Sequence, residues 1–177
     1  IIANREQANR ICKGKKPRWI VGDSRNVVAL ISDGGACAKV DFVFSCPPYF
    51  DLEVYSENPA DLSVATWPEF LTAYRAIIAA AVECLKPNRF ACFVVGDIRD
   101  SKGFYRNFPG ETIRAFQDAG AVLYNEAVLV TAVGSLPIRC GRQFESGRKL
   151  GKTHQNVLVF FKGDPKEVKE WPIPDFG

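Results

Sequence analysis

Four consecutive residues, Cys46-Pro47-Pro48-Tyr49, are suited to chemistry on a planar amino group. Each proline lacks a backbone N–H and has a fixed φ angle, so the stretch presents rigid carbonyl acceptors beside an aromatic ring. An amino group on a heteroaromatic ring has its lone pair drawn into that ring, and fixed acceptors for its hydrogens would favour a nucleophilic nitrogen. Tyr49 could stack on such a ring. The alternative is a rigid loop without chemistry, and the position of the motif in the chain argues against it.

The motif directly follows a predicted strand at residues 40–45, whose unbroken apolar run is typical of a strand buried on both faces of a parallel sheet. Two further strands are predicted at 18–21 and 90–95, followed by Gly-Asp pairs that contain Asp23 and Asp97. Ligands of doubly wound sheets bind at the carboxyl ends of their strands. We therefore expect the motif and these strand ends to converge on one crevice, although Asp97 could equally cap the next helix.

Helices alternate with these strands along the chain. Thr66 and Glu69 predict a capping box that opens a helix extending to residue 85, and a second helix is predicted at 109–119, ended by Gly120. An N-terminal helix is expected at residues 2–12. Strands at 121–131 and 156–161 follow. This order predicts an α/β fold with a doubly wound sheet.

The sequence around the motif resembles the amino-methyltransferase family, in which Asp, Asn or Ser precedes Pro-Pro and an aromatic residue just after a buried strand. Val21-Gly22-Asp23-Ser24 looks like the family's strand end whose acid contacts the adenine of the cofactor. Residues 2–9 resemble the helix that follows the acid binding the cofactor's ribose. The chain as a whole is similar to phage and bacterial DNA-modification methylases. The resemblance implies a Rossmann-like methyltransferase sheet with a final antiparallel strand.

The same resemblance implies transfer of a methyl group from S-adenosylmethionine to adenine N6 or cytosine N4 in DNA. The implied catalytic residues are Cys46, Pro47, Pro48 and Tyr49, and the implied cofactor-binding residues are Asp23, Ser24, Ser45 and Cys46. Two alternatives keep the fold but change the acceptor, to an RNA base or a protein glutamine amide. A third is a non-catalytic nucleic-acid-binding remnant. A cytosine C5 methyltransferase is disfavoured because that family places proline before its nucleophilic cysteine.

The sequence departs from the family pattern in two ways. Position 46 is cysteine, and a thiol is a weaker acceptor than the usual side-chain oxygen, so the Pro47 carbonyl is expected to carry most of that role. No glycine-rich loop of the kind that cradles the methionine part of the cofactor is found at the expected place. We therefore expect residues 1–162 to be an N-terminally incomplete methyltransferase domain that lacks the first strands and this loop. Residues 163–177 are expected to be a C-terminal extension.

A basic, glycine-containing segment separates the last two predicted strands and is too long for a simple connector. Its cations suit phosphate contacts, and its single aromatic residue could probe a base, although a solvated loop is the commoner role of such charge runs. The predicted DNA-binding residues are Arg139, Arg142, Phe144, Arg148, Lys149, Lys152 and His154. Arg99, Lys102 and Arg106 could extend the same phosphate track. His154 could instead be structural.

Composition limits the other possibilities. The chain has 177 residues, 47% of them hydrophobic and 24% charged, and its net charge of +3 does not by itself indicate a nucleic-acid-binding protein. No apolar run approaches the ~20 residues that span a bilayer, which predicts a cytoplasmic protein without a membrane partner. The six cysteines form no CxxC pair and there is one histidine, so no metal site is expected. The sequence leaves the oligomeric state open.

Overall fold

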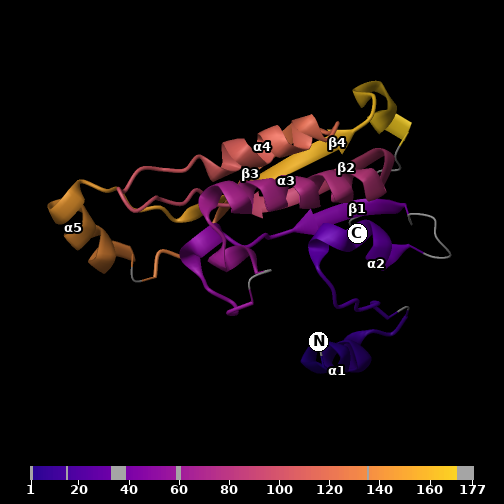
Figure 1. The fold of residues 1–177 in the computed structure, drawn as a ribbon, viewed down its shortest axis with the longest axis horizontal. Helices are drawn as coiled ribbons and strands as arrows, with labels where there is room; N and C mark the ends of the chain where they lie inside the picture. Colours follow the sequence, from indigo (N-terminus) through magenta and orange to yellow (C-terminus); the bar gives the residue numbers. More distant parts are fainter. Residues whose placement is uncertain (1, 15, 33–38, 59–60, 135, 171–177) are drawn as a thin grey trace.

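A computed structural model of the chain describes residues 2–14, 16–32, 39–58, 61–134 and 136–170. Within these residues the fold is a mixed α/β arrangement built on a four-stranded sheet (Figure 1). The strands are β1 (Val40–Ser45), β2 (Leu85–Val95), β3 (Val122–Val130) and β4 (His154–Lys162). The predicted α/β class is thus confirmed.

The strand order is β1-β2-β4-β3, so the last strand of the sequence lies inside the sheet. β1 and β2 are parallel, whereas β4 is antiparallel to both β2 and β3. The register places Ser45 beside Phe93, and therefore the carboxyl ends of β1 and β2 lie side by side. This confirms the expected final antiparallel strand, and it brings the motif after β1 next to the loop after β2.

One face of the sheet is covered by α3 (Trp67–Cys84) and α4 (Phe108–Asp118), as Figure 1 shows. Phe70, Tyr74 and Ile78 from α3 and Phe116 from α4 are buried against Phe160 and the other inward-facing residues of the sheet. At the start of α3 the Glu69 carboxylate accepts hydrogen bonds from the Thr66 backbone N–H and hydroxyl, which supports the predicted capping interaction.

The opposite face of the sheet is exposed in this part of the chain. Phe42 and Phe44 are 55% and 61% exposed, so the prediction that β1 is buried on both faces was wrong. The apolar run correctly indicated a strand, but burial depends on what packs against it. Val40 and Val43 of this strand pack against the core on the α3 side.

The strand predicted at 18–21 is also absent. Residues 16–23 form no ladder with any described strand, and Val21 is 76% exposed. A strand requires a hydrogen-bonded neighbour, and β1 pairs with β2 alone among the described strands. The segment instead leads in extended form to a 3₁₀ turn at Ser24–Asn26 and the short helix α2 (Val27–Ile31).

The remaining elements lie outside the main layers. α1 (Ile2–Ile11) is the predicted N-terminal helix and stands apart from the sheet in Figure 1. α5 (Leu136–Gly147) lies at the far end of the molecule from α2, beyond the carboxyl ends of β1 and β2. After β4, residues 165–170 form a 3₁₀ turn tied to the sheet by a hydrogen bond from Asn88 to Glu167. Among the described residues no helix is both long and apolar enough to cross a bilayer.

Candidate active site

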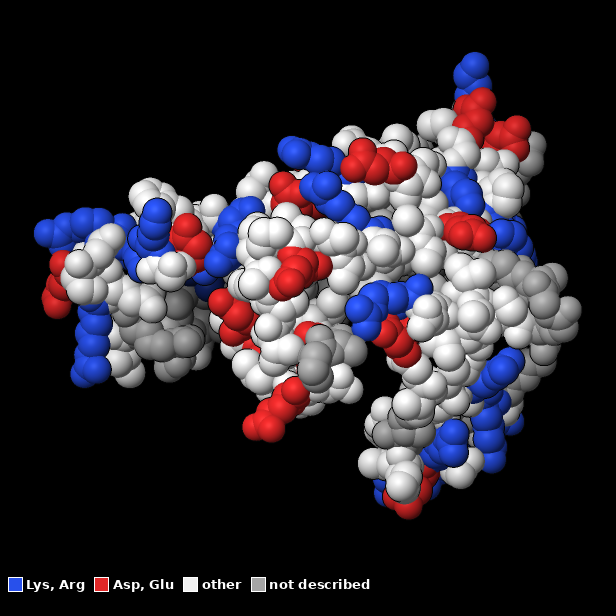
Figure 2. Space-filling view, viewed as in Figure 1, with Lys and Arg blue, Asp and Glu red and all other residues white. Residues whose placement is uncertain are grey.

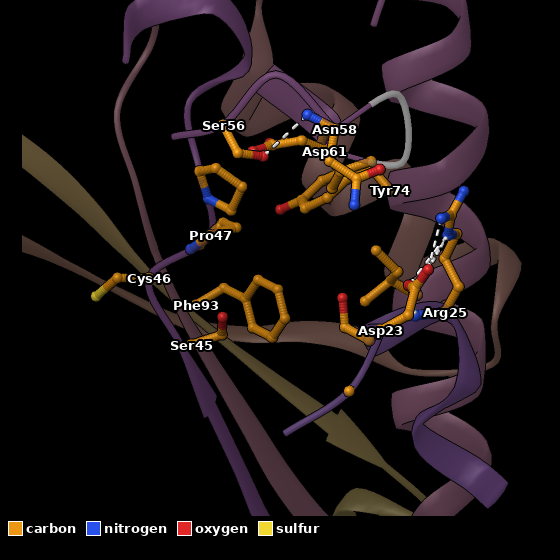
Figure 3. Close-up of a pocket in the computed structure, with 15 residues that line it drawn as sticks. Asp23, Arg25, Ser45, Cys46, Pro47, Ser56, Asn58, Asp61, Tyr74 and Phe93 are labelled. Carbon is orange, nitrogen blue, oxygen red and sulfur yellow. Dashed lines mark hydrogen bonds and ion pairs between the residues drawn. The ribbon is translucent and has the colours of Figure 1, made fainter. Parts of the chain in front are cut away.

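A pocket of about 530 Å³ lies between the carboxyl end of β1 and residues 22–25 (Figure 3). Six of the residues singled out from the sequence line it, namely Asp23, Ser24, Ser45, Cys46, Pro47 and Pro48. The structure therefore brings residues 22–25 and 45–48 together in one pocket. From the sequence, only the expected convergence of strand ends linked these two segments. A volume of this size is typical of a small-molecule site.

Asp23 is held by an arginine that the sequence analysis did not consider. Both carboxylate oxygens accept hydrogen bonds from the Arg25 guanidinium, and one also accepts from the Arg25 backbone N–H at 2.9 Å. These hydrogen bonds lower the pKa of Asp23 below its ordinary value. Asp23 is therefore a carboxylate at neutral pH, and any ligand that uses it must share it with Arg25.

The side chain of Cys46 does not face the pocket. Figure 3 shows its sulfur directed away from the cavity, whereas the rings of Pro47 and Phe93 border it. This follows from the alternation of side chains in β1, which places Cys46 on the same exposed face as Phe44. Cys46 therefore contributes its backbone to the pocket wall, while its thiol points away.

Asp61 provides a second carboxylate in this pocket, and the sequence analysis missed it. It accepts hydrogen bonds from the Ser63 backbone N–H at 2.9 Å and from the Ser56 and Ser63 hydroxyls at 2.8 Å. The Ser63 backbone hydrogen bond is the main cause of the lowered pKa of Asp61. With Asp23, this residue gives the pocket two ionised acids, opposed by the Arg25 cation.

Tyr49 lies beside this pocket rather than in its wall. Its hydroxyl accepts a hydrogen bond from the Gln155 amide at 2.5 Å, and its ring contacts the Phe108 ring edge-on at 6.0 Å between centroids. The backbone of Gly96 lies close to the same ring. Burial is the main cause of the raised pKa of Tyr49. The tyrosine is thus fixed between the ends of β2 and β4.

Phe50, directly after the motif, holds the loop in a strained conformation. Its φ angle is +53°, which is unfavourable for a bulky side chain. Its ring is 6% exposed and packs edge-on against Trp67 and Phe70, with centroid distances of 5.2 and 5.4 Å. The Arg106 guanidinium lies over the same ring at 5.0 Å. This buried anchor explains how the rigid turn keeps its position.

Asp97, at the end of β2, has a structural role. Its carboxylate accepts hydrogen bonds from the Ile98 backbone N–H at 2.9 Å and from the Phe108 backbone N–H, at the start of α4, at 3.0 Å. The capping interpretation is therefore supported. Asp97 also borders a second pocket of about 400 Å³, which lies between residues 51–52, the loop after β2 and the α5 region.

The predicted DNA-binding segment contains the helix α5, which was not predicted from this basic, glycine-containing sequence. Figure 2 shows lysine and arginine side chains gathered on the projecting arm that α5 forms in Figure 1. Arg148 lies over the Phe144 ring at 5.4 Å and donates to its carbonyl. The side chain of Arg139 lies outside the described part of the structure.

The basic residues are unequally placed with respect to the pockets. Lys152 lines the second pocket, whereas none of the predicted DNA-binding residues lines the first. His154 begins β4 opposite Val130 and is exposed. No cluster of His, Cys, Asp and Glu that could hold a metal occurs among the described residues.

Comparisons with known proteins agree with the fold. No protein-family model matches the sequence, and no curated protein matches it significantly. TTHA0409 of Thermus thermophilus, described as a putative DNA modification methylase, aligns with 88% of this chain at 17–18% identity and TM-scores of 0.58–0.59. It has also been crystallised with S-adenosyl-L-methionine. M1.HpyAVI, crystallised as a SAM complex, aligns with 82% of the chain at 13% identity and a TM-score of 0.51.

The chain spans about half the length of these structures, 54–56% of TTHA0409 and 52% of M1.HpyAVI. At such low sequence identity the similarity concerns the fold alone. The fold that the motif predicted is confirmed, because it is shared with TTHA0409 and M1.HpyAVI.

Proposed function

We propose that this chain takes part in methyl transfer from S-adenosylmethionine to an exocyclic amino group of a DNA base, either adenine N6 or cytosine N4. The observation that carries the proposal is the Pro47-Pro48 turn, which lies in the wall of the pocket that also contains Asp23. The named methylase with the same fold supports it.

The residues of the pocket fit part of this cofactor. Asp23, Asp61 and Ser24 offer acceptors for the amino and hydroxyl groups of a nucleoside, and the two carboxylates favour a positively charged ligand. No glycine-rich loop is present among the residues that line the pocket. When bound, the cofactor supplies a methyl group already activated by a sulfonium centre.

The task of the chain is then to position the amine. The Pro47 carbonyl accepts a hydrogen of the amino group and directs the nitrogen lone pair out of the ring plane. Tyr49, fixed by Gln155 and Phe108, offers an aromatic face on which the extruded base stacks. Such positioning supplies most of the rate enhancement when the methyl donor is already reactive.

The basic arm, which consists of α5 and residues 148–152, would hold the DNA. Arg142, Arg148, Lys149 and Lys152 are proposed to contact phosphates, and Phe144 and His154 to lie against the nucleotides. Since α5 lies beyond the carboxyl ends of β1 and β2 in Figure 1, the duplex would extend from the motif towards this arm.

Transfer of radiolabelled methyl groups to unmethylated duplex DNA tests the proposal. The full-length protein that contains this chain is expected to label DNA, and its Pro47→Ala, Tyr49→Ala double variant is not. An Arg114→Gln variant, altered on the exposed side of α4, is the matched control and should label normally. Nucleoside analysis of the product then distinguishes adenine from cytosine. Labelling of RNA or protein instead of DNA would contradict the proposed acceptor, and absence of all labelling would favour a nucleic-acid-binding role.

A further inference from the structure

Two cations from distant parts of the chain meet at one tight turn. This turn, residues 100–103, is closed by a hydrogen bond from the Gly103 N–H to the Asp100 carbonyl at 2.9 Å and is called the Gly103 turn. The Arg99 guanidinium donates to the Gly103 carbonyl at 2.7 Å. From the segment after α5, the Lys149 ammonium lies 3.0 Å from the position that a Cβ on Gly103 would occupy. The turn therefore joins the loop after β2 to the basic arm.

Neither cation is neutralised within the described chain. Arg99 and Lys149 form no ion pair there, although both side chains are half-buried. Arg99 is also held by the ring of Tyr105, 3.9 Å from the guanidinium carbon. Like charges brought together and partly withdrawn from water repel each other, so an arrangement of this kind is stabilised by an anion.

The acids nearest to the turn are engaged elsewhere. Asp100 accepts a hydrogen bond from the Phe104 backbone N–H at 2.8 Å, and Asp97 accepts the two backbone hydrogen bonds at the start of α4. Asp51 lines the second pocket together with Arg99 and Lys152, and it forms no ion pair with them. Two cations that form no ion pair among the described residues are suited to an external oxyanion.

We propose that Arg99 and Lys149 together clamp one backbone phosphate of DNA at the Gly103 turn. Guanidinium binds a phosphate through paired N–H donors, and the lysine adds a mobile point charge. The second pocket lies directly beside this clamp and is bounded by Asp51 and Leu52, which follow the motif closely in sequence. The clamped phosphate would thus belong to a nucleotide next to the one presented to Tyr49. This inference rests on the proposed function.

The salt dependence of DNA binding tests whether Arg99 and Lys149 contact one phosphate, because it reports the number of phosphates that the protein neutralises. Each phosphate neutralised by a protein contributes about 0.9 to the slope of log affinity against log salt concentration. Binding of labelled unmethylated duplex DNA should be followed by fluorescence anisotropy for the wild type, Arg99→Gln, Lys149→Gln and the double variant. Because both cations hold the same phosphate, each single change should lower the slope by less than one contact. The double variant should lower it by about one.

Two variants serve as controls. Lys149→Arg keeps the charge and should keep the slope, whereas Arg114→Gln removes a charge on α4 and should leave the slope unchanged. Thermal unfolding of every variant establishes that the fold is intact. A decrease of about two in the double variant would show separate phosphates, and an unchanged slope would show none. Either result overturns the clamp while leaving the proposed function standing. Failure of the wild-type chain to bind duplex DNA, with binding to RNA of the same sequence, would overturn both.

Discussion

Gln155, the second residue of β4, donates a hydrogen bond from its side-chain amide to the hydroxyl of Tyr49 at 2.5 Å, across a separation of 106 residues. The Tyr49 ring also contacts Phe108, and its hydroxyl lies 3.5 Å from the Val94 carbonyl. The aromatic face proposed to receive the base is therefore oriented by a strand that follows the basic arm in sequence. Gln155 is thus a positioning residue for the motif.

Replacing Gln155 by alanine should reduce methyl transfer by about fivefold to tenfold, since one hydrogen bond contributes about 1 kcal/mol. The loss should appear in kcat because Tyr49 would be mispositioned rather than absent. Gln155→Glu should restore most of the rate, since its carboxylate can accept from the tyrosine hydroxyl. Steady-state kinetics of the three proteins checks this.

Asn156→Ala provides the matched control. Asn156 is the next residue of β4, and its amide donates to Glu126 at 2.8 Å, away from Tyr49. Its removal costs a hydrogen bond of the same kind and should leave the rate unchanged. Equal rate losses in Gln155→Ala and Asn156→Ala would argue against the positioning role.

The strained backbone at Phe50 predicts that glycine at this position gives a more stable protein than alanine, the reverse of the usual order in a helix. At its φ of +53° glycine avoids a steric cost of about 1–2 kcal/mol that alanine retains. Phe50→Ala should therefore destabilise the protein by about 1 kcal/mol more than Phe50→Gly, although both lose the buried ring. The free energy of unfolding in urea measures the difference.

Phe70 gives the reference for this pair. It lies in the interior of α3, where glycine is about 1 kcal/mol less favourable than alanine. Phe70→Gly should accordingly be less stable than Phe70→Ala. If positions 50 and 70 show the same order, the positive φ angle at Phe50 does not strain the loop.

Tyr74 predicts a loss of stability at alkaline pH. Burial raises its pKa above the ordinary value of 10, although the hydroxyl also contacts Thr112 at 3.1 Å. Above pH 10 the unfolded chain releases this proton while the folded protein retains it. The contribution of Tyr74 to stability is therefore complete below about pH 10 and declines as the pH rises towards the raised value.

Unfolding free energies measured from about pH 8 to about pH 11 check this prediction. Tyr74→Phe removes the ionisable group and should flatten the pH dependence, while losing the hydrogen bond with Thr112 at all pH values. Tyr124→Phe is a suitable control, because Tyr124 is 40% exposed. An unaltered alkaline decline in Tyr74→Phe would assign the effect to other groups.

The exposed face of the sheet predicts poor solubility of the 177-residue chain. Phe42 and Phe44 are more than half exposed on β1, and exposed apolar strands at a sheet edge promote association. Phe42→Lys and Phe44→Lys should reduce light scattering with little change in unfolding free energy. Val43→Lys, which introduces a charge on the core-facing side, should instead destabilise the fold. Undiminished scattering in the two phenylalanine variants would place the association elsewhere.

The sequence alone determined the elements whose signals are local. Thr66 and Glu69 marked the start of α3, the apolar run marked β1, and the Pro-Pro turn had to follow that strand directly. The motif was also enough to indicate the fold that the chain shares with TTHA0409. Each of these predictions depends on residues that are neighbours in the chain, where propensity and steric restriction act without a partner.

The tertiary structure decided what depends on distant partners. The strand expected at 18–21 found no neighbour to pair with among the described strands, and β1 gained helical cover on one face only. The direction of the Cys46 side chain follows from the register of β1 in the sheet. The orientation of the Tyr49 ring depends on Gln155 of β4. Sheet pairing and burial arise from contacts between segments far apart in sequence, so they leave no local pattern from which the site could be fully predicted.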